Sequence, residues 1–274
     1  MLKKLLKYDF LSIRRFLIPL LLFTPVLAGF AGLLFWLTTF LGPRQILLSL
    51  GLSSMFGFAV FALVLSAAVL PIMLVIRYYS GLYSDSGYLT LMLPVKRRTM
   101  IFSKLLCAFL CELAHITVLF FSVVFVFGAI ANAGNPFSGF VTVWIDVIRF
   151  IASLSGQTAL LIIEIIVYVL VWIVLQFSIL YLGVTLGAVI FQGKGKVWGS
   201  VLFCFVTNSV VSTFLSLVEL ALSSSIIGAM SVEALENGFP AQLFLLIEIL
   251  MRIGISIGLY FFNVHLAEKK LNLG

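Results

Sequence analysis

The chain has 274 residues, of which 63% are hydrophobic and only 10% are charged. A soluble globular chain is about half apolar and a quarter charged, so this composition excludes a water-soluble fold and makes lipid the solvent for most of the chain. The formal net charge of +7 lies mainly in short segments between apolar runs, where Lys and Arg set membrane topology rather than bind nucleic acid.

The first fifteen residues have a helical pattern. Their apolar residues recur on one face, and these are Leu2, Leu5, Leu6, Phe10 and Ile13. Because the basic residues lie off that face, the pattern predicts an amphipathic helix, residues 1–15, in the membrane interface. The alternative is an ordinary charged flank of the first span. The apolar run that follows exceeds a signal-peptide core of about 7 to 15 residues, so we expect it to remain as a helix.

Six apolar segments are each long enough to cross a hydrocarbon core of about 30 Å at about 1.5 Å per residue. They are predicted at residues 16–40, 52–76, 105–130, 159–190, 199–222 and 241–264. The chain is therefore expected to be an all-α membrane protein, with six transmembrane helices forming a single transmembrane domain over residues 1–274.

The distribution of basic residues predicts the orientation. Fourteen of the 17 Lys and Arg fall on one side of these spans: Lys3, Lys4, Lys7, Arg14, Arg15, Arg77, Lys96, Arg97, Arg98, Lys104, Lys194, Lys196, Lys269 and Lys270. The positive-inside rule then places both termini in the cytoplasm. We expect the protein to be a multi-pass protein of the plasma membrane.

Two segments between spans are expected to be structured. In residues 131–158, Phe140, Trp144, Val147 and Ile151 share one helical face, which predicts a short helix on the outer leaflet anchored by Trp144. A loop packed on the span ends is an equal alternative. The segment 77–104 is the largest polar feature of the chain, and its mixture of tyrosines, leucines and a basic cluster is typical of a docking surface.

Within that segment, Gly87-Tyr-Leu-Thr-Leu-Met-Leu-Pro-Val-Lys-Arg-Arg98, followed by Ser103-Lys-Leu-Leu, resembles the loop after the second span in permease subunits of type-2 ABC exporters. Leu5-Leu-Lys-Tyr-Asp-Phe10, with Arg14, Arg15 and Phe16, is similar to the start of such permeases from Gram-positive bacteria. The resemblance covers the layout of the whole chain but is specific only in these two segments.

This resemblance implies a membrane-spanning subunit that dimerises with an identical or related permease and is driven by a separate ATP-binding subunit. The region from Ser80 to Leu93 would be the coupling helix inserted into that ATPase, with residues 1–15 as the connecting helix beside it. The residues expected to contact the ATPase are Tyr83, Asp85, Gly87, Tyr88 and Leu89.

The chain itself is not expected to be an enzyme or to hold a cofactor. Its nearest fragment to a P-loop, Gln192-Gly-Lys-Gly195, lacks the preceding glycine and the following Ser or Thr. Cys107, Cys111 and His115 share a face of the third span beside Glu112, but no second ligand pair accompanies them, so ordinary packing is favoured over a metal site.

Ionisable and polar residues inside spans are candidates for function. Glu248 and Arg252 lie four apart in the last span and can pair, either as an internal lock between helices or as charges lining a translocation path. Asn208, Ser212 and Ser216 form a polar stripe that either lines the path or joins helices. Glu164 and Glu219 are placed at span ends accessible to water.

Two other functions remain open from the sequence. A secondary transporter driven by an ion gradient would use the Glu248–Arg252 pair, although inverted repeats, its usual hallmark, are not evident. An intramembrane enzyme would need a nucleophile, and the only weak candidates, Ser53 and Ser54, have no histidine placed to serve them. The transported substrate is not indicated by any residue.

Overall fold

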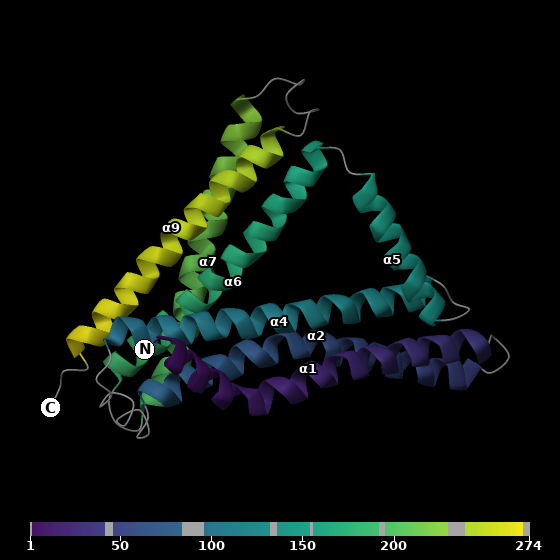
Figure 1. Cartoon of the computed structure of the whole chain (residues 1–274), viewed down its shortest axis with the longest axis horizontal. Coiled ribbons are helices and arrows are strands. Elements are labelled where there is room, and N and C mark those ends of the chain that lie inside the picture. The colour runs from purple at the N-terminus through teal and green to yellow at the C-terminus, as the bar shows by residue number, and fades with distance from the viewer. Residues whose placement is uncertain are drawn as a thin grey trace. The chain divides into compact units, whose positions relative to one another are not determined.

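The computed structural model describes residues 2–41, 46–83, 96–131, 136–153, 156–191, 195–229 and 239–270. These residues form seven α-helices and no strand (Figure 1). The helices are α1 (Leu2–Leu41), α2 (Ile46–Leu82), α4 (Arg97–Ala131), α5 (Pro136–Ala152), α6 (Gly156–Ile190), α7 (Lys196–Ala229) and α9 (Phe239–Lys270).

Six of these helices, all except α5, are long and apolar enough to cross a membrane. The prediction of an all-helical, multi-pass membrane protein is therefore confirmed. In lipid the backbone groups of a span must bond within the helix, which explains why these apolar runs are continuous helices.

The helix ends differ from the predicted boundaries. The predicted interfacial segment and the first span form one continuous helix, α1. Helix α2 runs on to Leu82 and α4 already begins at Arg97, so both neighbouring spans extend into the predicted loop 77–104. The sequence from Arg77 to Leu82 contains no proline, and nothing in it stops the helix.

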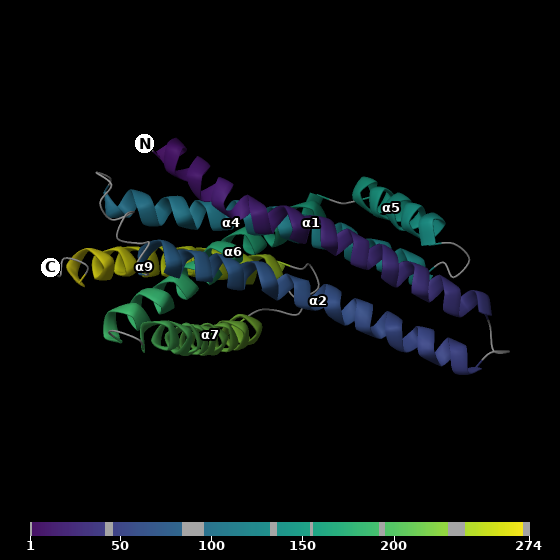
Figure 2. The ribbon, with the colours of Figure 1, turned by 90° about the horizontal axis from the view of Figure 1, so that it is seen from below.

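One compact unit comprises residues 8–73 and 110–155. Its core joins α1, α2 and α4 through small and aliphatic side chains: Ala28, Ala31, Leu34, Ala59, Leu63 and Val126. The three helices run along one another (Figure 2). Small residues such as Ala31, which is fully buried, let helix backbones approach closely where hydrophobicity alone gives no drive for association.

In the same unit the segment 131–158 contains the predicted short helix, α5. Its Phe140 and Trp144 rings contact Phe125 and Phe121 of α4, with ring centroids 5.7 and 5.3 Å apart. A Cβ at Gly128 of α4 would lie 2.8 Å from the carbonyl carbon of Gly139 in α5. The predicted anchor Trp144 therefore packs on the neighbouring helix.

The other unit comprises residues 1–7, 74–109 and 156–274. Helices α6, α7 and α9 form its body (Figure 1, teal-green to yellow). Leu175, Ile179 and Leu215 form an apolar cluster within it. At Gly183, a Cβ would lie 2.7 Å from the Cα of Cys204 in α7, so α6 and α7 touch through their backbones, and small residues permit this close approach.

Gly187 provides a direct test of this contact. A Cβ there would clash with the backbone of Gly199 and Ser200 in α7. We expect Gly187→Ala to lower the free energy of unfolding by about 1–3 kcal/mol, because backbone atoms cannot move aside as a flexible side chain can. Thermal unfolding of the detergent-purified protein measures this.

Gly254→Ala in α9 is the matched control, since a Cβ there meets nothing within 4 Å. It should leave stability unchanged or slightly raised, because alanine favours helix. Equal losses in the two variants would contradict the close α6–α7 contact.

Candidate functional site

Four buried polar side chains from the end of α2, from α6 and from α9 meet in one hydrogen-bonded network. The Tyr83 hydroxyl donates to Thr185 Oγ1 at 3.0 Å. Thr185 Oγ1 lies 2.6 Å from Asn263 Oδ1, to which it donates, and 3.3 Å from the Tyr78 hydroxyl. Asn263 Nδ2 in turn donates to the Tyr78 hydroxyl at 3.3 Å. Thr185 is thus the centre of the network.

Local structure explains why the tyrosines point inward. The Tyr78 ring stacks on Tyr181 of α6, with centroids 3.9 Å apart and ring planes 6° from parallel. Tyr83 follows the last turn of α2, where its amide donates to the Tyr79 carbonyl oxygen. Burial holds the pKa of the Tyr83 phenol well above its usual value, so the hydroxyl stays protonated and available as a donor.

A second set of bonds fixes the start of α4 to the last turns of α9. Arg97 Nη1 donates to the carbonyl oxygens of Ala267 at 2.7 Å and Glu268 at 3.2 Å. The Tyr260 hydroxyl donates to the Arg98 carbonyl oxygen at 3.0 Å. Carbonyl oxygens in the last turn of a helix lack hydrogen-bond donors within the helix and carry partial negative charge. An arginine there supplies both the donors and a positive charge.

These two sets of bonds hold the two ends of the segment predicted to dock a partner. Of the predicted contact residues, only Tyr83 is described. Tyr83 is 9% exposed, and its hydroxyl bonds to Thr185 within the chain. Its role in docking would therefore be to position the residues that follow it. Asp85, Gly87, Tyr88 and Leu89 lie outside the described residues.

A buried ionic cluster lies elsewhere in the same unit. The Arg252 and Glu248 side chains of α9 are 7% and 6% exposed, and Nη2 lies 2.6 Å from Glu248 Oε1. A second bond joins Arg252 Nε to the same oxygen at 3.0 Å. The predicted pair of residues four apart is therefore present in the structure.

The cluster also contains two members that sequence reasoning did not connect to it. Glu219 of α7 places Oε1 2.5 Å from Arg252 Nη2, although its side chain is 31% exposed. The guanidinium lies over the Tyr168 ring of α6, 4.8 Å from its centroid. Three helices thus converge on one arginine, which favours a role in joining them.

The polar stripe on α7 divides into two parts. Asn208 Oδ1 accepts a hydrogen bond from Gln176 Nε2 of α6 at 3.2 Å, which joins the two helices. Ser212 and Ser216 are exposed on the chain, and Ser216 Oγ donates to the carbonyl of Thr213 at 3.0 Å. Among the residues that the structure describes, Asn208 is therefore the one predicted path residue of these three that bonds to a neighbouring helix.

The third span contains buried polar groups without partners. His115 is fully buried, and within the described ranges neither of its ring nitrogens has a hydrogen-bond partner; the same holds for Glu112 Oε2 and Ser122 Oγ. Cys107 and Cys111 lie buried nearby on the same helix. Over the described part of the chain, no three His, Cys, Asp or Glu side chains are placed to hold one metal ion.

Comparison with known proteins gives no relative. No family model, no curated protein and no solved structure matches this chain.

Proposed function

We propose that the chain is the membrane-spanning subunit of an ATP-driven exporter of the type-2 ABC kind. A separate ATP-binding subunit would dock on the segment between α2 and α4, on the cytoplasmic side, and two membrane-spanning subunits would enclose the path. The resemblance of residues 87–98 and 5–16 to such permeases is the starting point, and the six apolar helices agree with the expected layout.

The observation that carries the proposal is the double attachment of that segment. Tyr78 and Tyr83 bond to Thr185 before it, and Arg97 bonds to the α9 carbonyls after it. A force applied to the segment by a partner would therefore reach α6 and α9 directly. A loop that served only as a connection would need no such buried polar bonds, which are costly to build unless all members are satisfied.

The exposed polar face of α7 supports a second membrane subunit. Ser209, Ser212, Thr213 and Ser216 are exposed along this apolar helix. Hydroxyls facing acyl chains gain little, whereas between helices or along a water-filled path they find partners. A second copy or a related permease covering this face would supply either setting.

The test is the isolation of the protein from its native membrane in mild detergent, with mass spectrometry of the proteins that stay bound. We expect a stoichiometric partner containing a P-loop, and we expect Asp85→Arg to reduce its recovery at least about tenfold, because a charge reversal at a docking surface costs several kcal/mol.

Asp146→Arg is the matched control: Asp146 is an exposed acid on α5, with 72% of its side chain exposed, and its reversal should leave recovery unchanged. A partner that survives Asp85→Arg would move the contact elsewhere in the segment. A folded preparation with no ATPase bound would overturn the proposal.

The ionic cluster favours one alternative, a secondary transporter driven by an ion gradient. Two carboxylates share one buried arginine, and surplus intramembrane acid can bind a proton or a metal cation. Transport into vesicles that hold no ATPase, driven by a proton or sodium gradient and lost on Glu219→Gln, would establish this alternative.

A further inference from the structure

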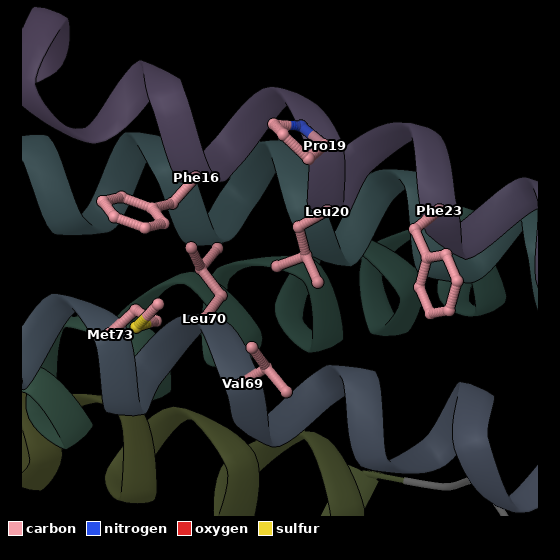
Figure 3. A pocket seen from close by; sticks show the side chains of 7 residues that line it. All are labelled: Phe16, Pro19, Leu20, Phe23, Val69, Leu70 and Met73. Atoms are coloured by element: carbon pink, nitrogen blue, oxygen red, sulfur yellow. The ribbon is translucent and has the colours of Figure 1, made fainter.

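An apolar groove lies between α1 and α2 within the unit formed by residues 8–73 and 110–155. Phe16, Leu20 and Phe23 of α1 face Val69, Leu70 and Met73 of α2 across it (Figure 3). Its volume is about 330 Å³. Leu70 is 1% exposed and forms the floor, whereas Phe16 and Phe23 are 47% and 54% exposed, so the groove opens on the surface of the unit.

Each of the two helices carries a proline beside the groove. Pro19 lines the groove, and Pro71 follows its floor residue Leu70. A proline within a helix removes one backbone hydrogen bond and displaces the preceding turn. Each helix thus lacks one backbone hydrogen bond beside the groove. All seven side chains that line the groove are apolar, which suits a hydrocarbon chain rather than a polar molecule.

Two arginines lie immediately before the groove on α1. Arg14 and Arg15 are exposed, and over the described part of the chain neither has a hydrogen bond or an ion pair. The two arginines point in different directions, because side chains four residues apart share a helix face. Arg15 lies on the face of Pro19, which lines the groove. Arg14 lies on the face of Ile18, which does not line it.

We propose that this groove holds one acyl chain of an anionic phospholipid whose phosphate binds Arg15. The groove supplies the apolar contact, and the unpaired guanidinium supplies the charge complementarity. Guanidinium binds phosphate through two parallel hydrogen bonds, which makes arginine well suited to a phospholipid headgroup. This site is independent of the exporter assignment, since it requires neither an ATPase nor a second subunit.

Native mass spectrometry of the full-length protein tests the proposal. The protein is stripped of lipid in detergent and titrated with phosphatidylglycerol or with phosphatidylcholine of the same acyl chains. We expect one phosphatidylglycerol to be retained in preference to phosphatidylcholine. Arg15→Gln should weaken its retention about fivefold. Arg14→Gln removes the same charge from the adjacent position and should change retention less than twofold.

Val69→Trp fills the groove from an exposed position and should lower retention of both lipids, with folding checked by size-exclusion chromatography. Equal binding of the two lipids, equal effects of the two arginine changes, or no effect of Val69→Trp would each overturn the proposal. So would a lipid-free dimer that Val69→Trp dissociates, because it would assign the groove to a second copy of the chain.

Discussion

Replacing Arg252 with leucine is expected to lower the free energy of unfolding by about 3–5 kcal/mol, the largest effect of any single change considered for this chain. The reason is the carboxylate left behind. Glu248 is 4% exposed, and Arg252 supplies both hydrogen bonds to its Oε1. Without the arginine, a buried acid loses its countercharge in a medium that solvates charge poorly.

The two acids of the cluster are expected to respond differently. Both Oε1 atoms lie within 2.6 Å of Nη2, so they are at most about 5 Å apart, and two ionised carboxylates so close repel one another. Glu219→Gln removes one negative charge and keeps an oxygen that can accept from Arg252. We therefore expect it to change stability by less than about 1 kcal/mol, whereas Glu248→Leu should approach the cost of Arg252→Leu.

Thermal and denaturant unfolding in detergent measure these losses. The double variant Glu248→Leu with Arg252→Met should recover most of the stability, because a buried ion pair replaced by apolar side chains of similar size often costs little. Arg149→Leu is the control: Arg149 and Asp146 form a pair 3.5 Å apart with side chains 77% and 72% exposed, and such a pair contributes almost nothing.

The same double variant separates the two roles left open for the cluster. If it folds and still supports transport, the charges serve only to join α9 to α7. If it folds with near-normal stability but transport is lost, the charges act on the translocated molecule or ion. A double variant as unstable as Arg252→Leu alone would contradict the account of the pair.

The sequence predicted those parts of the structure that depend on residues close together in the chain. Composition and segment length predicted six spans, because lipid requires a continuous helix wherever the backbone crosses it. The Glu248–Arg252 pair was predictable from its spacing of four. Glycines spaced four apart permit close helix approach, and Gly183 and Gly187 of α6 do meet α7. The same spacing at Gly254 and Gly258 of α9 meets nothing within 4 Å, so the spacing alone does not predict a contact.

Contacts between distant segments were not predictable in the same way. Glu219 lies 33 residues before Arg252 and was placed at a water-accessible span end, which is the ordinary setting for an acid in such a helix. Thr185 and Asn263 each stand in the sequence as a single polar residue within an apolar run. One signal was present: a polar side chain inside a span needs a partner, so Thr185, Asn263 and the nearby Tyr78 could have been considered together.

Thr185→Val is expected to lower the free energy of unfolding by about 1–3 kcal/mol and to impair coupling. Valine matches threonine in shape but lacks Oγ1, which accepts from Tyr83 and donates to Asn263. The free energy of unfolding falls because buried polar groups lose a hydrogen-bond partner. The fall is small because hydrogen bonds between membrane helices contribute only modestly to stability. Thr185→Ser keeps the hydroxyl and should retain most of the stability.

Thr117→Val is the matched control, because Thr117 is exposed and its hydroxyl donates to the Leu113 carbonyl oxygen of its own helix. It should change stability by less than about 0.5 kcal/mol. Unfolding in detergent measures all three variants, and equal losses in Thr185→Val and Thr117→Val would contradict the central place of Thr185 in the network.

The effect on coupling follows from the position of Thr185 between the docking segment and the membrane helices. If the chain is driven by a separate ATPase, Thr185→Val should leave the partner bound, since no docking residue is changed. ATP hydrolysis should then continue while transport falls, because the push on the segment no longer reaches α6 and α9 through a fixed contact. If the Thr185→Val complex folds and transports as much per ATP as the original chain, the network serves only to pack the helices. If the partner itself is lost, Tyr83 and Thr185 shape the docking surface rather than transmit its movement.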